Sequence, residues 1–311
     1  MTDLKIDKKQ IVKYLNMEAD NPEIEALIKA SFERNRRVFG TQGYVFAQWG
    51  VNCEPCSLDC EFCSLGESNF SFPAEFSLSP DEAVARLMET DLSAVSDIFI
   101  MSTADYPFDH ILAIGRKLRA LLPASLRLVA NVGDFSREEA YALRENGYTG
   151  FYHIVRLREG EDTKGDPEVR EQTIENGMDS GLELYYCIEP LGPEHKAEEI
   201  AQEILRAQEL KPAVMAVMRR IAIPGSSLYE KGEISDGELT KIAAVTNMAV
   251  LPERAMNVHE PCRDTLRAGI NQLYAELGVN PRDTEEETQK GRGFSVSQAW
   301  EYLNDNGYHR N

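Results

Sequence analysis

The chain has 311 residues, of which 42% are apolar and 27% charged, and its formal net charge is −19. This composition is typical of a folded globular protein and excludes a disordered or low-complexity chain. The acidic excess disfavours nucleic acid or an anionic membrane surface as the main partner. No apolar run approaches the roughly 20 residues of a membrane span. The N-terminal residues lack the apolar run of a signal peptide, so we expect a cytoplasmic protein.

In chain order, residues 1–43 are predicted to form an N-terminal helical region, because apolar side chains recur there at helical spacing. From residue 44 onward, short apolar segments typical of buried strands alternate with amphipathic segments typical of helices. The predicted strands cover 44–51, 97–101, 126–131, 151–157, 182–190, 213–223, 255–259 and 272–279. The predicted helices begin at Pro80 and cover 136–147, 168–181, 195–210 and 235–250, with a further helix near the C-terminus.

Helix boundaries can be read at several of these positions. Ser79 and Ser136 each precede a helical segment and can cap it, and Gly147 can end the second one. Strands that alternate with helices predict a parallel sheet, and eight such units predict closure. The expected fold is therefore an α/β protein, a (β/α)8 TIM-type barrel over residues 44–311, with a partial barrel of six units as the structural alternative.

Four of the six cysteines crowd into residues 53–63, in the segment CEPCSLDCEFC. In a reducing cytoplasm, such a cluster indicates metal ligation before disulfides. Cys56, Cys60 and Cys63 have the spacing Cys-x3-Cys-x2-Cys, and three thiolates in one loop can bind three irons of a [4Fe–4S] cluster, which leaves the fourth iron open. The loop follows the first predicted strand, so we expect it at the C-terminal end of the barrel, where active sites form.

Two other metal sites are compatible with these cysteines. Cys53 could join the other three in a zinc site with four thiolate ligands, although the three-residue connection between the two pairs is shorter than usual. All four could also hold a cluster that only transfers electrons, but the order of cysteines differs from that of bacterial ferredoxins. Both alternatives describe a non-catalytic metal-binding or electron-carrier protein.

The segment CSLDCEFC, with Phe62 before its last cysteine, resembles the signature of the radical S-adenosylmethionine (SAM) superfamily. The helical region that ends in NRRVFG and the segment 223–228, IPGSSL, resemble the branch that contains biotin synthase, methylornithine synthase and the hydrogenase maturases. The resemblance extends over about residues 30–305. It implies two cofactors, a [4Fe–4S] cluster and SAM, and reductive cleavage of SAM to a 5′-deoxyadenosyl radical that abstracts hydrogen from a substrate.

The resemblance also implies roles for individual residues. Cys56, Cys60 and Cys63 would bind the cluster, and Phe62 would lie near the adenine. The SAM amino group would be contacted by the segment after the second strand, which consists of Ser102, Thr103, Ala104 and Asp105 and lacks the usual glycine pair.

At the end of the fourth strand, an arginine suits the SAM carboxylate, with Arg156 as the first choice and Arg158 as the second. Asn131 and Glu189 end strands and would meet the ribose or the substrate, and Ile223 would contact the adenine. As catalytic residues, we expect Asp105, Glu189 and His259.

The substrate is expected to be a small molecule enclosed at the top of the barrel. The leading hypothesis is a carbon-skeleton rearrangement or fragmentation in cofactor or amino-acid biosynthesis, as in methylornithine synthase, and the alternative is assembly of a metallocofactor precursor. Cys187 corresponds to one ligand of the second cluster of biotin synthase, but the second and third predicted strands contain no cysteine, which disfavours sulfur insertion. The expected electron donor is a protein such as flavodoxin or ferredoxin.

Overall fold

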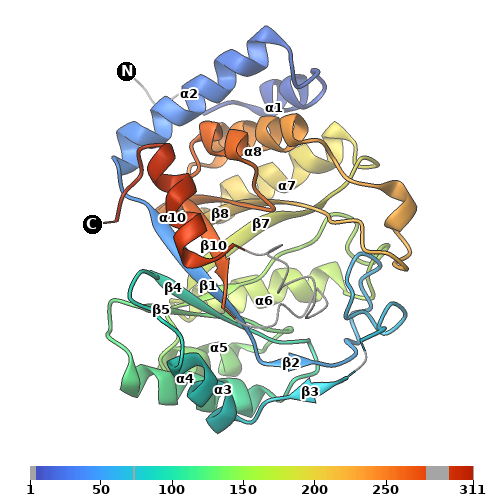
Figure 1. Ribbon diagram of the computed structural model, residues 1–311. Coiled ribbons are helices and arrows are strands. Elements are labelled where there is room, and N and C mark those ends of the chain that lie inside the picture. Colours follow the sequence, from blue (N-terminus) through green and yellow to red (C-terminus); the bar gives the residue numbers. More distant parts are fainter. Residues whose placement is uncertain (1–4, 73, 278–293, 311) are drawn as a thin grey trace.

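The computed structural model describes residues 5–72, 74–277 and 294–310. Eight strands form a closed barrel in the spatial order β1, β4, β5, β6, β7, β8, β9, β10 (Figure 1). Each strand is parallel to its neighbours, and β10 closes the barrel by pairing with β1. The strands are Tyr44–Gly50, Asp97–Met101, Arg127–Asn131, Gly150–Tyr152, Glu183–Leu191, Val214–Arg219, Ala255–His259 and Gln272–Glu276. The prediction of a complete (β/α)8 barrel is confirmed, and the six-unit alternative is wrong.

The helices follow the strands as the alternation of segments predicts. They are α3 (Pro80–Met88), α4 (Phe108–Leu121), α5 (Arg137–Glu145), α6 (Pro167–Asp179), α7 (Ala197–Leu210), α8 (Asp236–Val250) and α10 (Val296–Asp305). Two short 3-10 helices lie at Tyr229–Lys231 and Arg263–Ala268. Ser79 and Ser136 form capping boxes at the starts of α3 and α5, as expected.

Two helices precede the barrel, α1 (Lys8–Leu15) and α2 (Pro22–Phe39), and both pack against α8 on its outer side (Figure 1). The boundary between this region, residues 1–43, and the barrel, residues 44–311, stays a prediction. Within the part of the chain that the structure describes, no helix is both long enough and apolar enough to cross a membrane.

Two strands are several residues shorter in the structure than predicted. β6 ends at Tyr152 and β8 ends at Arg219, so residues 153–157 and 220–223 continue as irregular segments. Residues 153–157 are largely buried and residues 220–223 are buried or half-buried. This burial gives both segments the apolar pattern of a strand although they no longer pair. The last two residues of the predicted strand 272–279 lie outside the described residues.

The end of the barrel where the strands begin is closed by buried polar groups. Asp97 is fully buried and accepts hydrogen bonds from the Tyr185 hydroxyl at 2.5 Å and from Nε2 of Gln272 at 3.3 Å, and it also pairs with Arg254. Above this layer, Phe46, Phe99 and other aromatic and apolar side chains pack inside the barrel. In the described structure, the cavity of the barrel opens at the C-terminal ends of the strands.

Gly177 in α6 gives a test of how closely this helix packs on the barrel. An exposed helical Gly→Ala change would stabilise the helix by up to about 1 kcal/mol. A Cβ at Gly177, however, would lie 2.3 Å from the ring of Phe151. We therefore expect Gly177→Ala to lower the free energy of unfolding by about 2 kcal/mol in urea denaturation. Met178→Ala, an exposed change on the same helix, should alter it by less than about 0.5 kcal/mol.

Candidate active site at the mouth of the barrel

A cavity opens at the C-terminal ends of the strands and holds about 1250 Å³, including the solvent at its mouth. Strand ends and the loops that follow them form its wall, as is usual for active sites of this fold. Of the residues expected from the sequence, it is lined by Cys56, Cys60, Phe62, Cys63, Ser102, Thr103, Ala104, Asn131, Arg156, Glu189, Ile223 and His259.

The loop after β1 holds the three cysteines in a defined conformation. The Cys63 amide donates to the Cys60 carbonyl at 2.9 Å, and the Cys56 amide donates to the Leu65 carbonyl at 2.7 Å. Asn69 Nδ2 donates to the carbonyls of Cys60 and Cys63, at 3.2 Å each. The sequence analysis missed Asn69, because nothing in the order of residues shows that its amide reaches back over this turn.

A short ribbon separates Cys53 from the other three cysteines. β2 (Asn52–Cys53) pairs antiparallel with β3 (Phe76–Ser77), so Cys53 is held in a strand (Figure 1). Its thiol is buried, which raises its pKa to about 11. The cavity lining, within the described residues, includes Cys56, Cys60 and Cys63 but not Cys53. This separation disfavours a zinc site with four cysteine ligands.

The three loop thiols fit a cluster better than a single ion. The ligands of one tetrahedral zinc ion lie about 3.8 Å apart, since each Zn–S bond is about 2.3 Å. Within the described residues, the side chains that bring three ligand atoms to within 4.8 Å of one another are Asp162, Glu194 and His195, and not these cysteines. A wider spacing suits a [4Fe–4S] cluster, in which each thiolate binds a different iron.

Asp105 takes a different position from the one expected. It is exposed beyond the end of β4 (Asp97–Met101), and its two carboxylate oxygens accept from the amide and the hydroxyl of Ser57, each at 2.7 Å. It does not line the cavity in the described structure. The chain turns outward after Ala104, whose amide lies 3.5 Å from the Cys56 sulfur. Asp105 thus anchors the cysteine loop, and we withdraw it as a catalytic residue.

This anchoring can be tested with Asp105→Asn. An amide offers one acceptor oxygen where the carboxylate offers two, so one of the two hydrogen bonds from Ser57 is lost. Because the site is exposed, we expect a cost of about 1 kcal/mol and a loss of cluster iron to a chelator that is about fivefold faster. Asp109→Asn, an exposed acid in α4, is the matched control and should leave the rate unchanged.

Arg156 lies in the cavity wall, where its side chain is 18% exposed. Its Nη1 is 3.4 Å from a Glu159 oxygen, and its Nε is 4.0 Å from a Glu189 oxygen. This Nε is buried and has no hydrogen-bond partner among the described residues. Burial disfavours the charge, but Cys60, Glu159 and Glu189 outweigh it and raise the Arg156 pKa above its usual value. The guanidinium is therefore a permanent cation beside the cysteine loop.

A buried network of hydrogen bonds and ion pairs, which the sequence analysis missed, holds Arg156 in place. Glu159 accepts from the Arg156 amide at 3.0 Å and from Thr163 Oγ1 at 2.6 Å. Arg170 of α6 lies 3.6 Å from Glu159 and 3.3 Å from Asp134. Although burial opposes ionisation, hydrogen bonding from His153 and the charge of Arg170 lower the Asp134 pKa to about 2. These residues come from separate loops and a helix, so no local motif reveals the network.

Arg158, the second choice for the SAM carboxylate, faces another direction. Its Nε lies 3.3 Å from Glu199, and its Nη2 lies 3.5 Å from the Glu194 carbonyl. It does not line the cavity in the described residues. The two arginines are two residues apart in an irregular segment, and the structure leaves Arg156 as the candidate ligand for a carboxylate.

The inner wall of the cavity combines acids, aromatics and an imidazole. The Tyr152 hydroxyl donates to Glu189 at 2.6 Å, an interaction that the sequence does not reveal. His259 stacks on Tyr274, with ring centroids 4.9 Å apart and planes at 11°. His259 and Glu189 are both buried and both line the cavity, as expected for residues that meet a substrate.

Comparison with known proteins shows where this architecture occurs. The chain matches biotin synthase from Desulforudis audaxviator at 27% identity over 203 residues, 61% of this chain and 60% of the relative. Methylornithine synthase (PylB) has a TM-score of 0.85 at 14% identity, over 99% of this chain and 95% of that one. The hydrogenase maturase HydG from Carboxydothermus hydrogenoformans has a TM-score of 0.81 at 15% identity, over 98% and 76%. No family model matches.

The chain therefore has the fold of radical SAM enzymes. It is similar in sequence to biotin synthase and in fold to HydG and methylornithine synthase, which agrees with the resemblance of the cysteine motif. The chain spans about 60% of the length of the curated relative that it matches.

Proposed function

We propose that the protein is a radical SAM enzyme that acts on a small molecule. One observation carries this proposal: three thiols with the spacing Cys-x3-Cys-x2-Cys line the same cavity as the partly buried Arg156, at the mouth of a closed parallel barrel. When bound, a [4Fe–4S] cluster and SAM would together supply a 5′-deoxyadenosyl radical that abstracts hydrogen from the substrate.

The residues that line the cavity would bind different parts of the cluster and of SAM. Cys56, Cys60 and Cys63 would hold the cluster. Arg156 would bind the SAM carboxylate through its Nε, which has no hydrogen-bond partner among the described residues. The amino group would be received by backbone groups of Thr103 and Ala104 and by the buried hydroxyl of Ser102, which has no hydrogen-bond partner in the described part of the chain. Asn131 and Glu189 would contact the ribose, and Phe62 and Ile223 the adenine; all four line the cavity.

The deeper wall supports a small, polar substrate. Glu189, paired with Tyr152, and His259, stacked on Tyr274, present polar groups in a space that the closed barrel seals from below. Such a site suits an amino-acid-like compound whose carbon skeleton is rearranged or cleaved, which is the chemistry that we favour. Methylornithine synthase matches nearly the full length of both chains, whereas the match to HydG leaves about a quarter of that maturase uncovered. A protein such as flavodoxin or ferredoxin would supply the electron.

SAM cleavage tests the proposal directly. The protein is reconstituted anaerobically with iron and sulfide, mixed with SAM and dithionite, and assayed for 5′-deoxyadenosine, with SAM binding measured in parallel. We expect 5′-deoxyadenosine that depends on both iron and reductant, or at least SAM binding that requires the cluster. Protein that retains zinc, assembles no cluster and binds no SAM would contradict the proposal and favour a structural metal loop.

A further inference from the structure

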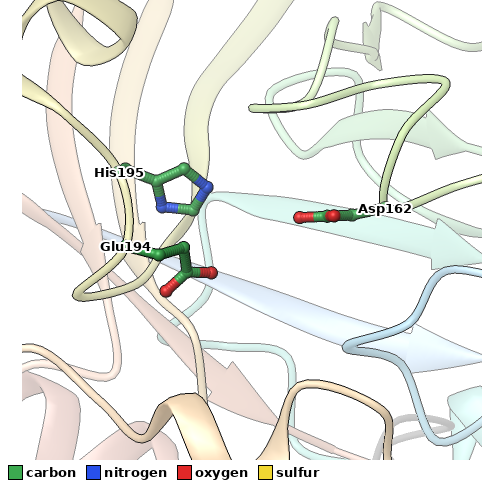
Figure 2. Close-up of side chains that lie close together, drawn as sticks. All are labelled: Asp162, Glu194 and His195. Carbon is green, nitrogen blue, oxygen red and sulfur yellow. The ribbon is translucent and has the colours of Figure 1, made fainter.

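A second group of ligand-type side chains lies beside the cavity, between two loops. Asp162 lies in the loop between β6 and α6, and Glu194 and His195 lie in the turn between β7 and α7 (Figure 2). One ligand atom from each residue lies within 4.8 Å of the other two. The motif analysis did not single out these residues, because the two loops are more than 30 positions apart in the chain.

Two atoms of this group are buried without a partner. His195 is 9% exposed, and its Nε2 has no hydrogen-bond partner among the described residues. The same holds for Oδ2 of Asp162. Figure 2 shows the imidazole of His195 and the Asp162 carboxylate facing each other across a gap. A buried polar atom without a partner costs about 1–3 kcal/mol, so two of them on opposite sides of one gap indicate a bound species between them.

The third side chain, Glu194, indicates that the bound species is a cation. Glu194 pairs with Arg220, and each of its carboxylate oxygens keeps a second lone pair. A water molecule could bridge His195 and Asp162, but two acids and one imidazole that converge within 4.8 Å form a ligand set for a cation. The imidazole selects a transition metal over Mg²⁺ or Ca²⁺, which prefer oxygen ligands throughout.

We propose that Asp162, Glu194 and His195 bind one divalent transition-metal ion, with zinc as the best match to one imidazole and two carboxylates. Three protein ligands leave a fourth position for water. The Gly192 amide donates to His195 Nδ1 at 2.9 Å, and the same nitrogen lies 3.2 Å from the Gly192 carbonyl. A metal on Nε2 would select the other tautomer, in which Nδ1 carries the hydrogen and donates to that carbonyl, at the cost of the hydrogen bond from the amide. This proposal does not depend on the proposed SAM chemistry.

The charges around the group are nearly balanced. Arg158 and Arg220 lie against Glu199 and Glu194, respectively, so each guanidinium already faces a carboxylate. Asp162 is the acid of this group whose Oδ2 has no hydrogen-bond partner in the described structure. Burial raises its pKa although Arg158 and Lys231 favour its charged form. A cation bound directly to Oδ2 would offset this cost of burial.

Such an ion would join the loop that supports the cysteines to the β7–α7 turn. The Asp162 carbonyl accepts from the Glu61 amide at 2.9 Å, and the Lys164 amide donates to the Leu58 carbonyl at 2.8 Å. Both contacts hold the cysteine loop from the side of residues 162–164. The ion would therefore stabilise the wall of the active-site cavity without touching it.

Zinc binding by protein that already carries its iron–sulfur cluster tests this site. The wild type, His195→Asn and His309→Asn are each mixed anaerobically with one to two equivalents of zinc, desalted, and analysed for zinc per chain. Asn can present an acceptor oxygen in place of Nδ1 but has no counterpart of Nε2, which isolates the ligand atom. His309 is an exposed histidine that contacts Asn304 and serves as the matched control.

We expect the wild type and His309→Asn to retain one more zinc than His195→Asn, with an affinity at least about tenfold higher by calorimetric titration. Zinc held by other thiols is common to all three proteins and cancels in the comparison. Equal zinc in all three, or no zinc in the wild type, overturns the proposal and leaves a bridging water.

A second variant keeps the test decisive if His195→Asn does not fold. Asp162→Asn keeps the shape of the side chain and removes its charge. Because a ligand that binds only the folded state raises the melting temperature, zinc should raise it in the wild type and His309→Asn but not in Asp162→Asn. An equal rise in the melting temperature of all three proteins would contradict the proposed metal site. None of these measurements uses SAM, so they are independent of whether SAM is cleaved.

Discussion

Cys60→Ala is expected to abolish 5′-deoxyadenosine formation, with a fall of at least about 1000-fold, equivalent to about 4 kcal/mol in the barrier. Cys60 is the buried, central member of the three thiols that line the cavity. Two remaining thiolates cannot hold three irons, so the cluster is lost or becomes labile. The measurements are iron and sulfide per chain, the visible absorption of the cluster, and chromatographic assay of 5′-deoxyadenosine.

Cys262→Ala is the matched control for Cys60→Ala. Cys262 is a free, partly buried cysteine that precedes the 3-10 helix Arg263–Ala268 and does not line the described cavity. The Cys262→Ala variant should retain the cluster, and its rate of 5′-deoxyadenosine formation should change by less than about twofold, because the substitution lies away from the cavity. If Cys60→Ala keeps a full cluster, or if Cys262→Ala loses it, the assignment of the three ligands is wrong.

Arg156→Ala is expected to raise the Kd for SAM about 100-fold, or about 3 kcal/mol, because it removes a charged hydrogen-bond donor from a buried site. The change also leaves the buried acids Glu159 and Glu189 without the cation between them, so folding must be checked by circular dichroism. Arg156→Lys keeps the charge but loses the planar pair of donors, and we expect an intermediate Kd. Equilibrium binding of SAM to the cluster-loaded protein is the measurement.

Arg158→Ala provides the control of the same residue type two positions away. Its guanidinium donates hydrogen bonds to Glu199 and to the Glu194 carbonyl, and it does not line the described cavity. We expect the Kd for SAM to change by less than about twofold, as for a partly exposed ion pair away from a ligand. A large effect of Arg158→Ala with none of Arg156→Ala would reverse the order of the two candidates.

The alternation of segments was sufficient to predict the fold. The predicted strands 97–101 and 255–259 agree with the structure at both ends, because a strand buried on both faces consists mostly of apolar residues. The prediction extended strands over 153–157 and 220–223, because full or partial burial alone gives the same apolar pattern. The cysteine motif could be recognised for a similar reason: all three proposed ligands lie within eight consecutive residues, and their spacing indicates the type of metal site.

The surroundings of the motif required the folded chain. Asp105 looked like a ligand from its place after a strand, yet the outward turn of the chain directs it to Ser57. Asn69 orders the cysteine loop, and Glu159 orders Arg156. No local sequence pattern predicts either contact.

By itself, the sequence determined the barrel and the cysteine loop, and it indicated the chemistry that we propose, because each depends on residue types at short, regular spacing. Only the tertiary structure decided which arginine faces the cavity, that Asp105 anchors the loop, and that Asp162 meets His195. These outcomes depend on the directions of side chains from loops far apart in the chain. Such directions are set by packing and closure of the barrel, which bring the eight strand ends to one mouth.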